Sequence, residues 1–296
     1  MKAKLFLVTP PFTQLNTAYP ATSYIKGFLE EKKVSVSHFD LSIELFTSVF
    51  TPNFLRSVFQ EALDLENYNY PLIIEMKELY ISRVDVVIGF LQKQDIETAK
   101  KIVEANFLPL GHRLLNVNTE IKWEDGEPGV IDKAKHFSTL FIEEIGDFIQ
   151  ANVDEFFSFT KYAEQIATSA SSFDQIEEFL NYQPTLIEDK MLMILEEQIK
   201  GRAPDLVCFT IPFPGNLFAA LRCSQFIKQF FPKIQIAFGG GYCNTELRSL
   251  EDPRIFEFID FISLDDGEGP LLKIVNYIEA KSDINELERT FVLENN

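Results

Sequence analysis

The sequence is poor in the residues that build disulfides and metal sites. Its 296 residues include three cysteines and three histidines. Cys208, Cys223 and Cys243 are odd in number and widely spaced, so they form neither a disulfide framework nor a CxxC metal motif. No histidine stands at ligand spacing from a cysteine or a carboxylate. We therefore expect no structural metal, and the cysteine usage fits the reducing cytoplasm best.

Long apolar runs and an excess of positive charge are also missing. The run after Met1, KAKLFLVTPP, has about five apolar residues, too few for a signal-peptide core or a membrane span. The chain has 27 basic and 45 acidic residues, and its formal charge is -18. This charge argues against a nucleic-acid backbone or an anionic membrane as the main partner, although it also serves solubility.

An alternation of apolar strand-like runs and amphipathic helices occupies both ends of the chain. The segments 4–9, 34–39, 206–211, 234–238 and 258–264 are predicted strands. The segments 19–32, 216–231, 244–250 and 270–280 are predicted helices, with Asn244 or Thr245 as a cap of the third. This order predicts an α/β fold: a doubly wound, Rossmann-like, five-stranded parallel sheet.

The middle of the chain has a different pattern. From residue 42 to residue 200, apolar residues recur at spacings of three and four, which is typical of helices. Residues 84–91 have strand-like composition but helical spacing, and we interpret them as helix. The prediction is therefore a sheet domain made of residues 1–41 and 201–281, a helical insertion over 42–200, and a linker over 282–296 toward a further domain.

The stretch IAFGGGYCNTE, residues 236–246, joins a predicted strand to three consecutive glycines. Such a run lets the backbone turn sharply and lets a ligand approach it closely. With the strand order 2-1-3-4-5, the order reverses between the first and third strands, where ligands bind in such sheets. The loops there, Thr9 to Phe12 and Thr210 to Phe213, both read T-x-P-F. Chance similarity, or prolines that merely end strands, would explain this pattern equally well.

The usual phosphate-binding signatures are missing. No GxGxxG follows the first strand and no glycine-rich loop ends in Lys-Ser or Lys-Thr, which disfavours a dinucleotide and a nucleoside triphosphate. Asp265, Asp266 and Glu268 crowd the start of the last helix and would repel a phosphate. They suit a ligand that offers hydroxyl and amide donors, or they simply complement the helix dipole.

Four blocks of the sequence resemble a known family. They are PPFTQLNTAYPATSYIKGFLEE, DLVCFTIPFPGNLFAALRCSQFIK, IAFGGGYCNTELR and FISLDDGEGPLL. Together they resemble the N-terminal cobalamin-binding domain of B12-dependent radical SAM proteins, over roughly residues 3–40 and 204–281. The third block matches the family's GG turn. The fourth matches its GEGE-like element, with Pro270 where a second acid is common.

The resemblance implies that cobalamin lies over the carboxyl ends of the strands and that its nucleotide tail enters the domain. It implies a tail slot at Gly239, Gly240 and Gly241. Polar partners for the corrin amides are Thr9, Thr13, Gln14, Asn16, Thr210 and Asn216. Aromatic partners are Phe12, Tyr19, Phe213 and Tyr242, for each of which core packing is the alternative. The remaining rim residues are Pro10, Pro11, Pro212, Asp266, Gly267 and Glu268.

Two motifs known from cobalamin-binding and radical SAM proteins are absent. The DxHxxG motif of another cobalamin-binding class, which supplies a histidine to cobalt, does not occur. Neither does CxxxCxxC, which would hold the four-iron, four-sulfur cluster that cleaves S-adenosylmethionine. We therefore assign no catalytic or metal-binding residue, and we expect the chain alone not to be catalytic. A C-terminal radical SAM barrel, in cis or in trans, would carry the cluster and S-adenosylmethionine for methyl transfer or related radical chemistry.

Two other functions remain open at this point. The chain could be a non-catalytic ligand-binding or protein-interaction module whose cobalamin site has decayed. It could also be an α/β enzyme that binds a nucleotide or a sugar, which the missing phosphate loops disfavour.

Overall fold

The computed structural model describes residues 2–14, 19–117, 121–159, 173–249 and 252–293. The chain forms two compact units. The sheet unit comprises residues 1–45, 158–184 and 188–296, and the helical unit comprises residues 46–157 and 185–187. The helical unit is smaller than the insertion predicted over 42–200, because residues 158–184 and most of the helix that follows belong to the sheet unit.

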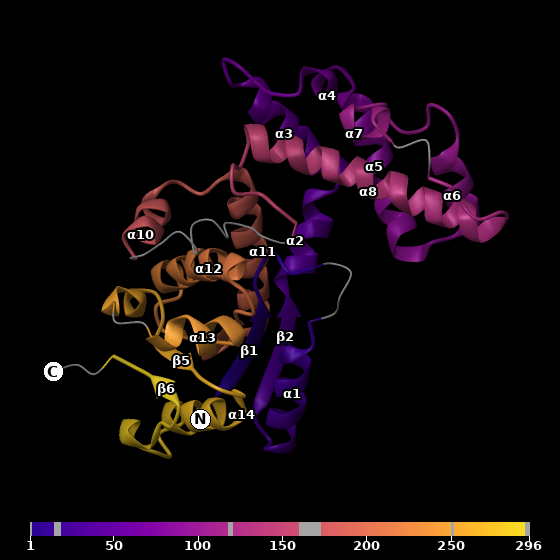
Figure 1. The fold of residues 1–296 in the computed structure, drawn as a ribbon. Helices are drawn as coiled ribbons and strands as arrows, with labels where there is room; N and C mark the ends of the chain where they lie inside the picture. Colours follow the sequence, from indigo (N-terminus) through magenta and orange to yellow (C-terminus); the bar gives the residue numbers. More distant parts are fainter. Residues whose placement is uncertain (1, 15–18, 118–120, 160–172, 250–251, 294–296) are drawn as a thin grey trace. The chain divides into compact units, whose positions relative to one another are not determined.

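The sheet unit contains a mostly parallel six-stranded sheet (Figure 1). Its strands are β1 (Lys4–Thr9), β2 (Ser35–Asp40), β3 (Leu206–Thr210), β4 (Gln235–Gly239), β5 (Phe261–Ser263) and β6 (Thr290–Phe291). They lie in the order β2-β1-β3-β4-β5-β6. The first five strands are parallel to one another, whereas β6 is antiparallel to β5. The prediction of five strands was therefore wrong by one, since part of the predicted linker pairs with the sheet edge.

The helices of the sheet unit follow the strands in alternation. They are α1 (Ala21–Glu31), α10 (Asp174–Asn181), α11 (Leu186–Arg202), α12 (Leu217–Phe230), α13 (Gly241–Thr245) and α14 (Glu268–Ile278), with α11 starting in the helical unit. Short 3₁₀ turns are η1 (Pro214–Asn216), η2 (Leu247–Ser249), η3 (Pro253–Glu257) and η4 (Ile284–Glu286). The helix predicted over 244–250 was placed too late, because α13 begins directly after the glycine turn at Gly240.

Side chains that alternate along the strands fill the two faces of the sheet. Leu7 of β1 and Cys208 of β3 form one buried cluster with Leu29 of α1 and Leu271 of α14. The side chains between them, such as Phe6, point to the other face. There the guanidinium of Arg202 in α11 lies 4.8 Å from the centre of the Phe6 ring. Helices therefore cover both faces of the sheet, which explains why the central strands β1 and β3 are mostly apolar and buried.

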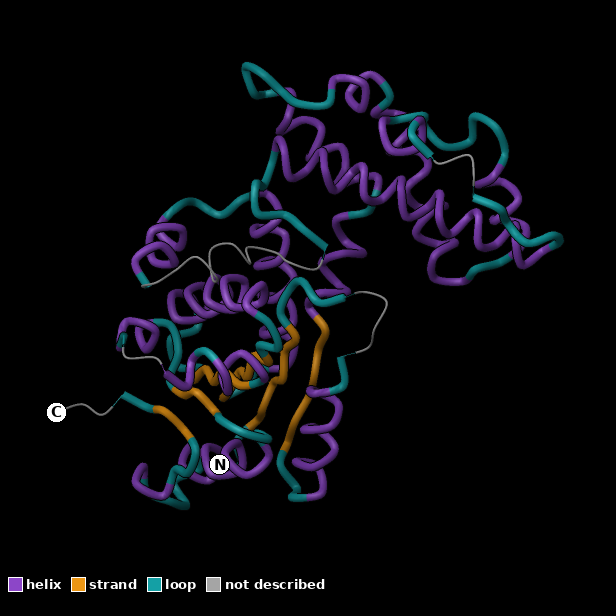
Figure 2. Tube along the Cα trace, in the orientation of Figure 1, coloured by secondary structure: helices purple, strands orange, loops and turns teal. Residues whose placement is uncertain are grey.

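The helical unit packs around one long helix, as the purple trace in Figure 2 shows. Its helices are the end of α2 (Leu41–Val49), α3 (Pro52–Leu63), α4 (Pro71–Glu75), α5 (Lys77–Lys93), α6 (Ile96–Val103), α7 (His112–Leu115) and α8 (Glu127–Asn152). Residues 84–91 lie within α5, so their prediction as helix is confirmed. Tyr80 of α5 is buried, stacks on Phe141, and donates a 2.7 Å hydrogen bond to the buried Glu144 of α8.

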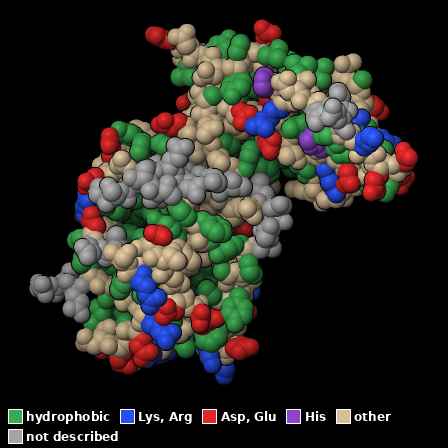
Figure 3. All heavy atoms as spheres, in the orientation of Figure 1, with side chains coloured by type: hydrophobic (Ala, Val, Ile, Leu, Met, Phe, Trp, Pro, Cys, Tyr) green, Lys and Arg blue, Asp and Glu red, His purple; other side chains and the backbone are tan. Residues whose placement is uncertain are grey.

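The surface carries charges of both signs. On the face that Figure 3 shows, acidic and basic side chains are interspersed on each unit. Within the part of the chain that the structure describes, no helix is long and apolar enough to span a membrane.

Candidate functional site

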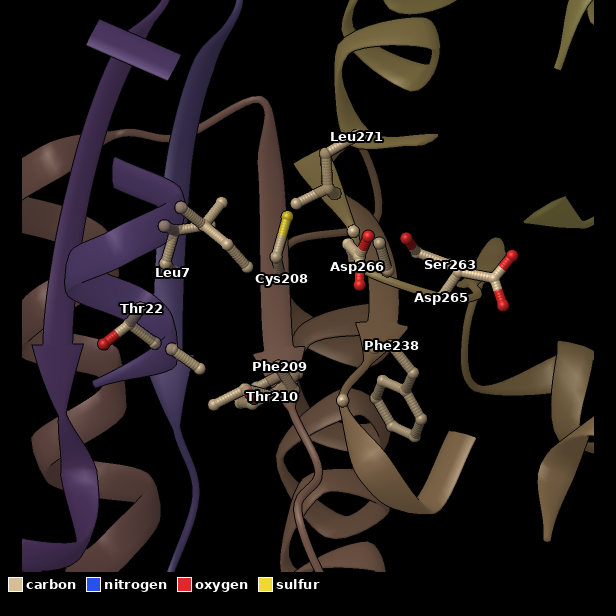
Figure 4. A pocket seen from close by; sticks show the side chains of 16 residues that line it. Leu7, Thr22, Cys208, Phe209, Thr210, Phe238, Ser263, Asp265, Asp266 and Leu271 are labelled. Atoms are coloured by element: carbon tan, nitrogen blue, oxygen red, sulfur yellow. The ribbon is translucent and has the colours of Figure 1, made fainter. Parts of the chain in front are cut away.

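The sheet unit has a cavity of about 100 Å³ at the carboxyl ends of its central strands. Figure 4 shows residues of β1, α1, β3, β4, β5 and α14 around it. The lining consists of Leu7, Ala21, Thr22, Ile25, Cys208, Phe209, Thr210, Ala237, Phe238, Gly239, Gly240, Ser263, Asp265, Asp266, Gly267 and Leu271. The cavity therefore lies on the face of the sheet that α1 and α14 cover, next to the point where the strand order reverses.

Strand register arranges the lining in two rows. Leu7 pairs with Cys208, which pairs with Ala237, and these apolar residues form the deeper row. Two residues further along, Thr210 pairs with Gly239, and Ser263 of β5 continues this second row. Because side chains two apart share a face, the second row lies nearer the strand ends. The cavity thus has an apolar floor and two hydroxyl groups closer to its mouth.

The mouth is formed by the loop between β5 and α14. Asp265 has a left-handed backbone with φ +60°. The Asn244 side chain makes two hydrogen bonds to the backbone of Asp265. Its amide nitrogen donates to the Asp265 carbonyl at 3.0 Å, and its oxygen accepts from the Asp265 N–H. Its carboxylate pairs with Arg248 at 3.0 Å and with Arg289 at 3.3 Å. No lysine or arginine lines the cavity in the described part of the chain, so no cationic side chain of the lining would pair with a phosphate group.

The glycine turn lines the cavity and also lies in close contact with the backbone of the loop after β3. Gly240 has φ +106°, and a Cβ built on it would lie 2.8 Å from the carbonyl oxygen of Ile211. Two hydrogen bonds join the glycine turn to the loop after β3. The Ile211 N–H donates to the Gly239 oxygen at 2.7 Å, and the Tyr242 N–H donates to the Ile211 oxygen at 3.0 Å. Only a glycine fits at 240, because the loop after β3 crosses it. Gly239 has no positive φ, and its Cβ would lie 3.6 Å from the Ser263 oxygen, an ordinary contact.

Asn216 ties two loops of the rim together. It is fully buried, and its side-chain amide donates to the carbonyls of Pro10 and Phe12 at 3.1 Å each. The Thr13 N–H donates to the hydroxyl of Ser42 at 3.0 Å in the same region. Asn216 therefore holds the loop after β1 against the loop after β3. Its role as a corrin partner stays a prediction, and its Oδ1 has no hydrogen-bond partner among the described residues.

The predicted site residues fall into three groups. Those that line the cavity are Thr210, Gly239, Gly240, Asp266 and Gly267. Those buried away from it are Thr9, Pro10, Pro11, Phe12, Thr13, Pro212, Asn216 and Tyr242, with burial raising the pKa of Tyr242 to about 12. Those with exposed or half-buried side chains outside it are Gln14, Tyr19, Phe213, Gly241 and Glu268, whereas Asn16 lies outside the described residues.

Sequence reasoning missed most of the apolar lining. The sequence predicted that Leu7 and Cys208 lie in strands and that Thr22 and Ile25 lie in a helix. It did not predict that their side chains face one cavity. The alternation along each strand would have placed Leu7 and Thr9 on one face. It could not have shown that Ser263 lies across from Gly239, because that depends on the register between β4 and β5.

The three cysteines are all buried. Burial raises the pKa of the Cys208 and Cys223 thiols well above the usual range, and that of Cys243 to about 12. We predict that an aromatic disulfide reagent modifies none of them rapidly in the native protein at neutral pH, since thiolate is the reactive form. In denaturant, all three thiols of each chain should react rapidly with the reagent. Rapid labelling of one thiol per native chain would contradict the burial of these residues.

Among the described residues, no group of three or more histidine, cysteine, aspartate or glutamate side chains is arranged to hold a metal ion. No protein-family model, curated protein or solved structure significantly matches the chain.

Proposed function

We propose that the sheet unit is a doubly wound, Rossmann-like domain that binds cobalamin. The corrin would lie over the carboxyl ends of β1, β3 and β4, and the base of its nucleotide tail would occupy the cavity between α1 and α14. The observation that carries this proposal is the cavity itself. It is lined in part by Gly239 and Gly240 and lies next to the reversal of strand order, where ligands of such sheets bind.

The chemistry of the lining fits the base of the tail. A flat heteroaromatic ring would contact the floor of Leu7, Cys208 and Ala237, and the hydroxyls of Thr210 and Ser263 would face its polar atoms. The absence of cationic side chains in the described lining suits an uncharged ring better than a phosphate.

The cavity must widen to hold that ring. At about 100 Å³ it is smaller than the roughly 150 Å³ cavity that accepts benzene. The half-buried Ile25 and the first turn of α1 form the wall that can move with the least loss of packing. We infer that binding displaces the Ile25 side chain from the slot.

The rim would position the corrin. Phe213 is 55% exposed beside the loop after β3 and offers an aromatic surface, while Gln14 offers an exposed amide. Buried Asn216 and Phe12 would act indirectly, by fixing the two rim loops. When bound, cobalamin would supply a cobalt-carried methyl group or a related radical reaction. The cluster and S-adenosylmethionine would belong to a radical SAM barrel in cis or in trans.

Binding of hydroxocobalamin tests the proposal. The purified chain is mixed with hydroxocobalamin and desalted, and the visible spectrum of the protein fraction is recorded. We expect corrin absorbance that follows the protein. We expect Gly239→Val to weaken binding at least tenfold, because its methyl groups would fill the slot while the allowed backbone leaves the circular dichroism unchanged.

Gly27→Val is the matched control. Gly27 is exposed on α1, and a Cβ there meets nothing within 4 Å, so binding should persist. A wild-type protein that retains no corrin at concentrations well above micromolar would refute the proposal. That result would leave the chain as a ligand-binding or interaction module of another kind.

A further inference from the structure

The helical unit has an open pocket of about 510 Å³ that the proposed function does not use. Leu140, Glu144 and Asp147 lie at spacings of four and three along α8, so they share one face of that helix. Residues of the short helix α7, together with Tyr70 just before α4, form the other walls. The whole lining belongs to the helical unit, and the volume is in the range of pockets that hold small molecules.

Glu144 is a buried carboxylate without a paired cation. It is 1% exposed, and it accepts hydrogen bonds from the Tyr80 hydroxyl at 2.7 Å and from the Arg113 backbone N–H at 3.0 Å. Both donors are neutral, and Glu144 forms no salt bridge among the described residues. A buried carboxylate is ordinarily paired with a cation, because the hydration that it loses is costly. The charge of Glu144 is therefore available to a cationic ligand in the pocket.

The carboxylate of Glu144 is also held in one position. Gly111 directly precedes α7, and a Cβ on this residue would overlap the carboxylate, which therefore packs against the Gly111 backbone. The Tyr80 hydroxyl fixes one carboxylate oxygen and the Arg113 N–H fixes the other. Each oxygen keeps a lone pair for a second hydrogen bond. Because the group is ordered before a ligand arrives, binding costs little side-chain entropy.

Arg113 lies nearby, but its guanidinium is directed at other carboxylates. It donates to the two oxygens of Asp147 at 2.6 Å and 3.0 Å, and to Glu143 at 2.6 Å. One arginine is thus shared among three neighbouring carboxylates, which leaves an excess of negative charge at the pocket. Among the described residues these acids are not arranged to hold a metal ion, so an organic cation is the better ligand.

The pocket offers apolar surface beside these charges. Tyr70 and Leu140 line it directly. The chain on either side of Tyr70 and around α7 exposes further apolar side chains, namely Tyr68, Leu72, Leu110 and Leu115. The face of an exposed aromatic ring attracts a cation, and exposed apolar side chains in such numbers are typical of a binding site. A ligand with a cationic end and an apolar body fits this combination.

We propose that this pocket binds an organic primary amine, with the ammonium group at Glu144 and Asp147 and the apolar part of the ligand against Tyr70 and Leu140. An ammonium group suits the site better than a guanidinium, because it is compact and the neighbours of Glu144 leave little of the carboxylate open. The amine is either a free molecule or the lysine side chain of a polypeptide. The inference does not depend on the proposed function, since the pocket lies wholly in the helical unit.

Isothermal titration calorimetry of the full chain at neutral pH and low salt tests this preference for charge. The probes are phenethylamine and its neutral analogue phenethyl alcohol. We expect the amine to bind at least tenfold more tightly than the alcohol, the effect of a hydrogen bond between charged groups. The ratio of the two affinities should fall at high salt, because ions screen the pairing. The peptide acetyl-Leu-Lys-Leu-amide separates the two sources. Tighter binding than phenethylamine indicates a lysine side chain, and weaker binding indicates a free amine.

Two variants locate the ligand. Glu144→Gln removes the charge and keeps an oxygen that can accept from the Tyr80 hydroxyl. It should weaken the amine at least tenfold and leave the alcohol unchanged, so that the ratio approaches one, which partial unfolding would not produce. Tyr70→Ala replaces an exposed residue of the wall and should weaken both probes.

Asp132→Asn is the matched control. Asp132 is an exposed carboxylate of α8 that does not line the pocket and that pairs with Lys135 at 3.5 Å. The variant removes the same charge and should leave the ratio unchanged.

Three results would overturn the proposal. They are amine and alcohol that bind equally, a chain that binds neither, and a preference for the amine that Glu144→Gln leaves intact. If Glu144→Gln does not fold, Tyr70→Ala decides, since unchanged binding there would place the amine elsewhere. None of these results bears on the binding of cobalamin by the sheet unit.

Discussion

Replacing Gly240 with alanine is expected to destabilise the sheet unit by about 2–4 kcal/mol, because the new Cβ meets backbone that cannot move. The added carbon would lie 2.8 to 3.0 Å from the carbonyl oxygen, nitrogen and carbonyl carbon of Ile211. Those atoms are fixed by hydrogen bonds to Gly239 and Tyr242. The positive φ of Gly240 adds a conformational cost for any residue with a side chain.

Gly239→Ala is the control for this prediction, since it adds the same methyl group one residue earlier. Its Cβ has an ordinary contact with Ser263 and its φ is not in the left-handed region, so the change should stay within about 1 kcal/mol. Urea unfolding followed by circular dichroism measures both variants. Equal stabilities would show that the crossing at Ile211 is not rigid. Because Gly240 variants are expected to be destabilised, a loss of ligand binding in them would not by itself report on the slot.

Replacing Arg222 with methionine is expected to cost about 3–5 kcal/mol, since it removes a buried guanidinium that pairs with the buried Glu188 carboxylate. The side chains of Arg222 and Glu188 are each 4% exposed and pair at 3.3 Å. Arg222 also donates to the carbonyls of Leu180 at 2.7 Å and Phe179 at 2.8 Å. This one side chain on α12 therefore holds both α11 and the end of α10 within the sheet unit.

A second replacement separates charge from packing. The double variant Arg222→Met with Glu188→Leu removes both charges of this pair, and part of the lost stability should return. The backbone carbonyls of Phe179 and Leu180 would still lack their donor, so the recovery should be incomplete. Guanidinium unfolding of the single and double variants gives the comparison. A double variant less stable than Arg222→Met would contradict the loss of the ion pair with Glu188 as the main cause.

Local sequence patterns were sufficient for most of the sheet. Apolar runs such as 4–9 and 206–211 are strands because both faces of a parallel sheet are covered, which leaves few polar positions. The helical spacing within residues 84–91 correctly outweighed their strand-like composition, since α5 buries one stripe. The tail was misjudged, because β6 has only two residues and its pairing depends on a partner edge far away in the sequence.

The glycine turn shows where local reasoning ended. The sequence by itself determined that a strand runs into three glycines, where the backbone can turn sharply and be approached closely. Only the tertiary structure decided that the partner at Gly240 is the loop after β3 and that Gly239 lines the cavity with room for a Cβ. In the same way it gathered Leu7, Thr22, Cys208, Ser263 and Leu271 around one cavity. Strand order and register bring these residues together, and both arise from packing between segments far apart in the chain, which no local pattern encodes.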